Sequence, residues 1–186
     1  MSRPPESRRR SIRIPGYDYT QWGSYFVTLC AWQNHCSFGS VVGGALQLSE
    51  IGRRVEACWE AIPAHFSSVE LDEFIVMPNH VHGILMLSPS SSAESNPIVS
   101  TPVERFGHPV AGSVPTIIRS FKAAATRDVR RFLQRSDFVV WQRNYYEHVV
   151  RDENALVRIR QYIIDNPARW EFDPYNPDPS HRVDTW

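Results

Sequence analysis

The sequence predicts an α+β fold in which four strands form one antiparallel sheet and the helices pack on one face of it. Three observations support this fold: segments with strand-like alternation, segments with helical periodicity, and the order of the two kinds along the chain. That order is the β-α-β-β-α-β order of a ferredoxin-like domain. A length of 186 residues and a hydrophobic content of 42% suit one soluble domain with a single core.

Four segments have the composition of strands. They are rich in β-branched and aromatic residues, and turn-forming residues separate most of them. They lie at residues 25–33, 69–77, 80–87 and 138–141. After the first of them, residues 37–49 place paired glycines between short apolar pieces, which predicts a hairpin.

Three segments have apolar residues at helical spacing instead, each three or four residues apart. They lie at residues 50–61, 114–133 and 153–166. Ser49 and Asp152 stand where N-cap residues are expected, directly before the first and the last of these helices. Pro167 predicts the end of the last helix, because proline cannot continue one.

Composition divides the chain into a domain and flanking segments. We expect residues 1–22 to form a basic N-terminal arm, residues 23–175 a single domain and residues 176–186 a C-terminal tail. Residues 88–113 are rich in serine and proline and have no periodicity, so we expect a long mobile loop there, outside the core.

The formal net charge is +0, but the charges are unevenly distributed. Residues 1–14 hold five arginines and one acid, and residues 117–143 hold seven cations and two acids. Such segments occur as solvated helix faces and also as nucleic-acid-binding surfaces, because local charge and not net charge sets the electrostatic footprint. Charge alone leaves both interpretations open.

The expected compartment is the cytoplasm. Three cysteines, Cys30, Cys36 and Cys58, are too few and too scattered for a disulfide framework. No apolar run approaches the length of a membrane span, and the first residues lack the apolar region of a secretory signal.

The segment His80-Val81-His82 is a candidate metal site. Residues i and i+2 of a strand point to the same face, so two imidazoles would project side by side. Two histidines do not complete a metal site, and a third ligand must come from another segment. The alternative is a pair of unrelated, hydrogen-bonded strand histidines.

Tyr162 and Asn166 form a second constellation. They are four residues apart on the last predicted helix and would share one face. A tyrosine can act as a covalent nucleophile, and an amide oxygen can bind a hard cation. The alternative is a tyrosine at the edge of the core and a C-capping asparagine. Asn166 precedes Pro167, and a residue before proline is disfavoured in the helical region of φ and ψ, which loosens the expected spacing.

Together these segments resemble the single-tyrosine HUH transposases, and most closely the REP-associated tyrosine transposases. The resemblance extends from about residue 8 to 174. It rests on DEFIVMPNHVHGILML, WQRNYYEHVVRDE and YIIDNPARW, in that order. It implies an HUH endonuclease fold, Tyr162 as the nucleophile and His80, His82 and Asn166 as ligands of Mg²⁺ or Mn²⁺. Tyr145 and Tyr146 lack the helix-plus-amide spacing.

The resemblance also implies cleavage and rejoining of hairpin-containing single-stranded DNA through a 5′-phosphotyrosyl intermediate. The hairpins would be short repetitive extragenic palindromes (REPs). The expected protein is nucleoid-associated, is a monomer or a homodimer, and has no membrane partner. The expected DNA-binding residues are Arg8, Arg9, Arg10, Arg13, Arg119, Lys122, Arg127 and Arg130.

Two other functions stay open at this point. The first is a DNA-binding regulator that keeps the fold but does not cleave, which would need the basic residues but not the histidine, tyrosine and asparagine set. The second is a small-molecule metalloprotein that uses only the histidine pair, which would give no role to the basic arm.

Overall fold

The computed structural model describes residues 17–88 and 110–177. Most of the predicted arm, the predicted 88–113 loop and the predicted tail lie outside these residues. Within the described residues, no helix combines the length and the apolar character that crossing a membrane requires.

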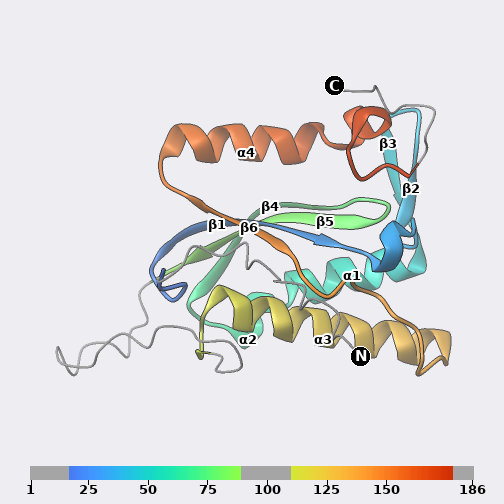
Figure 1. Cartoon of the computed structure of the whole chain (residues 1–186), viewed down its shortest axis with the longest axis horizontal. Helices are drawn as coiled ribbons and strands as arrows, with labels where there is room; N and C mark the ends of the chain where they lie inside the picture. Colours follow the sequence, from blue (N-terminus) through green and yellow to red (C-terminus); the bar gives the residue numbers. More distant parts are fainter. Residues whose placement is uncertain (1–16, 89–109, 178–186) are drawn as a thin grey trace, which may run out of the picture.

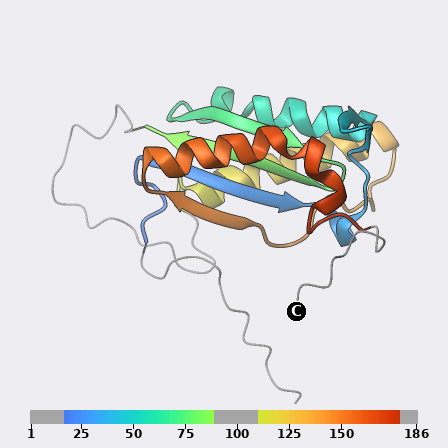
Figure 2. The same ribbon diagram turned by 90° about the horizontal axis from the view of Figure 1, so that it is seen from above.

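The predicted four-stranded antiparallel sheet is confirmed, with one strand in a different place from the prediction. Its strands are β1 (Gly23–Cys30), β4 (Val69–Val76), β5 (His80–Leu87) and β6 (Tyr146–Val150). They lie in the order β4-β5-β1-β6, and every neighbouring pair is antiparallel. This is the ferredoxin-like strand order, with β1 and β5 in the centre (Figure 2). The 37–49 hairpin is also present, as β2 (Gly39–Val42) and β3 (Ala45–Leu48).

The helices pack on both faces of the sheet, which corrects the prediction of a single face. The helices α1 (Glu50–Glu60), α2 (Ile62–His65) and α3 (Val114–Leu133) lie below the sheet in Figure 1, and α4 (Glu153–Asp165) lies above it. Short 3-10 helices follow β1 (η1, Trp32–Asn34) and α4 (η2, Pro167–Phe172). The second layer exists because the upper face is apolar too: Leu156 and Ile163 of α4 bury against Phe26 and Ile84.

The larger core lies between the sheet and α1–α3. Alternate residues of β1, including Tyr25 and Val27, face it and are fully buried. Trp59 of α1 fills its centre and packs directly on Gly83 of β5, where an added Cβ would lie 2.3 Å from the indole ring. The glycine therefore permits the close approach of α1 to the sheet.

The predicted strand at residues 138–141 is wrong. Only one isolated bridge forms there, between Ala31 and Trp141, and the last strand of the sheet is Tyr146–Val150. The apolar character of 138–141 has another cause, because Val140 and Trp141 are buried in the core without entering the sheet.

Candidate active site

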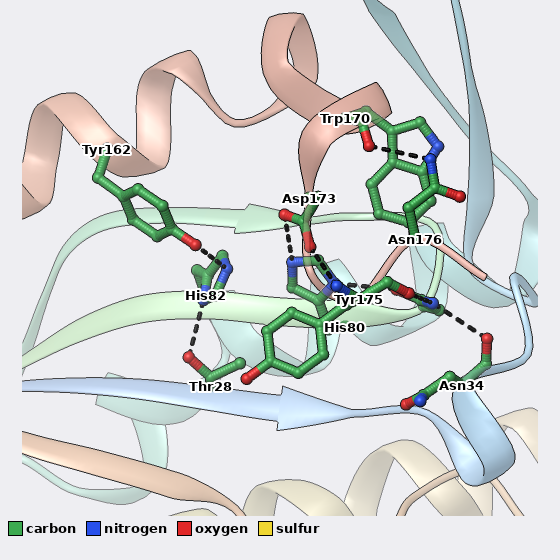
Figure 3. Close-up of polar contacts among 10 residues, drawn as sticks. Thr28, Asn34, His80, His82, Tyr162, Trp170, Asp173, Tyr175 and Asn176 are labelled. Carbon is green, nitrogen blue, oxygen red and sulfur yellow. Dashed lines mark hydrogen bonds and ion pairs between the residues drawn. The ribbon is translucent and has the colours of Figure 1, made fainter. Parts of the chain in front are cut away.

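The histidine pair lies on β5, at the centre of the sheet, on the face that α4 covers (Figure 3). The ring centroids of His80 and His82 are 4.4 Å apart, and both side chains are almost completely buried. The two imidazoles are therefore neighbours, as the i, i+2 spacing predicts.

Hydrogen bonds fix how the two rings are turned. Asn79 donates its Nδ2 to the backbone carbonyls of Asn34 and Tyr175, at 3.0 and 2.7 Å. Its Oδ1 then accepts from Nδ1 of His80 at 2.9 Å, which leaves Nε2 of His80 as the free lone pair. Nδ1 of His82 is also hydrogen-bonded, 2.8 Å from the hydroxyl of Thr28 on β1. Such contacts to Nδ1 are what orients a metal-binding histidine through Nε2.

Burial keeps both rings neutral. It holds the pKa of His80 well below the ordinary 6.5, and the neighbouring His82 lowers it further. Burial alone lowers the pKa of His82 to about 3. Neutral imidazole is the form that binds a metal ion, so both rings are in the ligand form at neutral pH.

Tyr162 reaches the histidine pair from α4. The helix starts at Asp152, whose side chain accepts from the backbone N–H of Ala155 at 2.8 Å. The Tyr162 hydroxyl lies 3.2 Å from Nε2 of His82, and its side chain is 39% exposed. Burial raises the pKa of the Tyr162 phenol and so does the carboxylate of Asp173, while a hydrogen bond from Asn166 lowers it.

Asn166 keeps its helical position despite the proline that follows. Its φ and ψ are −57° and −43°, because Pro167 begins the 3-10 helix η2 and the chain continues to turn. The asparagine is therefore one helical turn from Tyr162 and on the same side. Its side chain is buried, and its Oδ1 has no hydrogen-bond partner among the described residues.

Asp173 is the site residue that the sequence analysis missed. It lies directly after η2, and its Oδ2 is 3.9 Å from Nε2 of His80 (Figure 3). The backbone N–H of Tyr175 donates to the other carboxylate oxygen at 2.7 Å. Burial raises the pKa of the Asp173 carboxyl. Nothing in the local sequence marks this aspartate, because only the turn after η2 brings it to the histidines.

Three of these side chains could together hold a divalent cation. One ligand atom from each of His80, His82 and Asp173 lies within 4.8 Å of the other two. Nε2 of His80 and Oδ1 of Asn166 are buried without hydrogen-bond partners among the described residues, and a cation would satisfy both. Imidazole nitrogens with amide and carboxylate oxygens suit Mn²⁺, and the oxygens also suit Mg²⁺.

The helix α3, which carries five basic residues, lies on the side of the sheet opposite to α4 (Figure 1). A groove of about 850 Å³ lies between α3 and the segment 134–143. Its cationic lining is Lys122, Arg127, Arg130, Arg131, Arg135 and Arg143. Arg119 is exposed but does not line the groove, and the four predicted arginines of the arm lie outside the described residues.

Two cations of this groove also hold the protein together. Lys122 donates to the carbonyls of Gln142, Arg143 and Asn144, and burial lowers the pKa of its amine to about 8. Nε of Arg130 donates to the carbonyl of Phe138 at 2.8 Å. Lys122 and Arg130 thus fasten the segment before β6 to α3.

Two solved structures of transposases are similar to this chain. The chain is similar to a REP-associated tyrosine transposase bound to a REP hairpin, with a TM-score of 0.54, 16% identity, and 91% of this chain and 74% of that chain covered. It is also similar to a putative transposase from Deinococcus radiodurans, with a TM-score of 0.45, 18% identity and coverages of 82% and 97%. The first likeness shows that the chain has the fold of that tyrosine transposase.

The sequence itself has a closer relative. An uncharacterized protein of Haemophilus influenzae is 40% identical over 166 residues, which cover 89% of this chain and 91% of that protein. The chain belongs to the same family as this Haemophilus influenzae protein. No protein-family model matches it.

Proposed function

We propose that this protein is a metal-dependent DNA transesterase of the single-tyrosine HUH type, which cleaves and rejoins hairpin-containing single-stranded DNA. One observation carries the proposal: the hydroxyl of Tyr162 lies 3.2 Å from Nε2 of His82, beside the group of ligand atoms from His80, His82 and Asp173. A nucleophile next to a cation site is the arrangement that attack on a phosphodiester requires.

His80, His82, Asn166 and Asp173 would hold the cation. A bound Mg²⁺ or Mn²⁺ supplies Lewis-acid stabilisation of the charge that develops on the scissile phosphate. Thr28 and Asn79 keep the two imidazoles turned towards this position.

Tyr162 performs the covalent step. Its phenolic oxygen forms a bond to phosphorus while the bond from phosphorus to the 3′-oxygen breaks, which leaves a 5′-phosphotyrosine and a free 3′-hydroxyl. The phenolic proton leaves to the solvent that reaches the partly exposed side chain. Attack by another 3′-hydroxyl reverses the step, so rejoining needs no nucleotide cofactor.

The proposed substrate is single-stranded DNA with a hairpin, and the similar transposase of known structure is bound to a REP hairpin. The groove below the sheet would contact DNA phosphates through Arg127, Arg131, Arg135 and Arg143, which lie along it. Arg130 and Lys122 would support this surface by holding the 138–144 segment in place. We propose that the protein acts on DNA in the nucleoid.

The geometry favours this function over a non-cleaving DNA-binding regulator. A regulator has no use for buried, unpartnered ligand atoms beside a tyrosine, because burying them without a partner destabilises the fold. A small-molecule metalloprotein that uses only the histidine pair leaves the basic groove on the opposite face without a role.

The decisive experiment is covalent capture. The protein is incubated with labelled hairpin oligonucleotides carrying single-stranded flanks, with Mn²⁺ or with EDTA, and adducts that resist denaturation are counted. We expect an adduct that needs the metal, carries the 5′-phosphate end and disappears in Tyr162→Phe. Tyr145→Phe and Tyr146→Phe should retain it. An adduct on the peptide with Tyr145 and Tyr146 would refute the assignment of Tyr162.

A further inference from the structure

A second cavity lies beside the candidate nucleophile, between α4 and the edge strand β6. Its volume is about 290 Å³, at the lower end of the range for ligand pockets. The sheet contributes Phe26, Tyr146 and His148, and α4 contributes Ala155, Arg158 and Ile159. The cavity therefore has aromatic and aliphatic walls with a phenol, an imidazole and a guanidinium among them.

The polar side chains of this cavity are not engaged elsewhere. The side chains of His148 and Arg158 are exposed and make no hydrogen bond or ion pair with any residue that the structure describes. Tyr146 is 47% exposed, and its ring makes a T-shaped contact with Phe26 at a centroid distance of 6.4 Å. A free aromatic face next to free donors is the composition of a site for a planar, polar-edged ligand.

Phe26 connects this cavity to the candidate active site. Its ring stacks on His82 at a centroid distance of 5.4 Å and makes T-shaped contacts with Tyr162 at 6.2 Å and with Tyr146 at 6.4 Å. Arg158 is four residues before Tyr162, so both lie on one side of α4, about 6 Å apart along the helix axis. A ligand in the cavity would therefore adjoin a phosphate held at Tyr162.

We propose that this cavity binds the base of a nucleotide that flanks the scissile phosphate, an inference that rests on the proposed function. Tyr146 supplies the stacking surface, His148 and Arg158 supply donors for the edge of the base or the adjacent phosphate, and Phe26 closes the inner end. The NYYEH segment, which the choice of Tyr162 leaves without a catalytic role, thereby contributes to the choice of cleavage position.

The test is an abasic scan of bound DNA. Hairpin oligonucleotides with randomised single-stranded flanks are first enriched for binding to Tyr162→Phe, which cannot form the adduct. One selected sequence is then made abasic at each flanking position in turn. Dissociation constants are measured for Tyr162→Phe alone and for the same chain with Tyr146→Ala, Tyr146→Phe, Arg158→Gln or, as a control on the outer side of α4, Val157→Ala.

We expect one abasic position to weaken binding by Tyr162→Phe about 5- to 150-fold, the range that loss of one stacked base produces. With Tyr146→Ala the loss of affinity at that position should shrink to about twofold. A remaining loss of about twofold is within the error to which the effects of independent changes add. Tyr146→Phe and Val157→Ala should keep the full penalty, and Arg158→Gln should reduce it. Equal penalties with and without Tyr146→Ala at every position would overturn the proposal, as would a failure to enrich any oligonucleotide.

Covalent capture by the wild-type chain separates this inference from the proposed function. If an adduct forms but Tyr146→Ala changes the abasic penalty at no position, the base-binding proposal is wrong and the proposed cleavage activity stands. Coupling without an adduct keeps the pocket as a single-strand binding site and overturns the cleavage activity.

Discussion

Acid should destabilise the metal-free protein through its buried histidines, and His82 sets the size of the effect. Burial lowers the pKa of His82 to about 3 in the folded protein, against 6.5 when it is exposed. Above pH 6.5 the imidazole is neutral in both states and contributes no pH dependence. Below it only the unfolded chain binds the proton, so the free energy of unfolding falls with the pH until the folded pKa is reached. At about 1.4 kcal/mol per pH unit, the loss reaches about 2 kcal/mol at pH 5.

Urea unfolding at pH 7 and pH 5 in EDTA measures this effect. The wild-type chain should lose about 2 kcal/mol more over this interval than His82→Gln, because only the histidine titrates. The comparison cancels the contributions of groups that do not contact His82. His80 keeps the larger cause of its lowered pKa in both chains, because burial is that cause and His82 is the smaller one. His65→Gln, an exposed position on α2, controls for the removal of a histidine. Equal losses in the wild-type chain and in His82→Gln would refute the reasoning.

Three further changes test other parts of the structure. Thr28→Val removes the hydroxyl that orients His82 and should weaken Mn²⁺ binding by about 10- to 100-fold in calorimetry, and an unchanged affinity would exclude this role. Gly83→Ala places a methyl group against Trp59 and should destabilise the chain by about 1–3 kcal/mol in urea unfolding, and unchanged stability would contradict that packing. Arg127→Gln should reduce the salt dependence of single-stranded DNA affinity by about 0.7 in the log–log slope if it contacts one phosphate, and an unchanged slope would place the DNA elsewhere.

The regular elements were predictable where periodicity was strong. A helix forms at residues 114–133 and a strand at residues 80–87, both with the predicted bounds. The long apolar stripe of the first segment is buried when it is helical, and the apolar run of the second is buried in the centre of the sheet. The segment 138–141 has strand composition but no free sheet edge. The polar segment around Tyr146 takes the edge beside β1 instead, where one side of the strand has no strand partner.

The candidate site was predictable only in part. The positions of some of its residues follow from local spacing, and those of others depend on how distant segments pack. The i, i+2 spacing of the histidines and the i, i+4 spacing of Tyr162 and Asn166 follow from local geometry. Their convergence depends on which face of the sheet α4 covers, which local spacing does not encode. It was expected only from the resemblance to the HUH transposases. The place of Asp173 depends on the turn after η2, which no sequence period encodes.

Under the proposed function, the position of the sheet between two helical layers constrains the path of the DNA. Tyr162 and the histidines lie above the sheet, and the basic groove lies below it. The sheet and part of the helical layer on each side therefore lie between the two sites. A packed sheet has no opening, because β1 and β5 are hydrogen-bonded along their whole length. A strand that contacts both sites must therefore pass an edge or an end of the sheet. The β6 edge carries Tyr146 and His148, and the segment before β6 lines the groove. Within the described residues, this edge is the one path on which side chains suited to DNA connect the groove to the candidate active site. The exposed Tyr146 lies on that path.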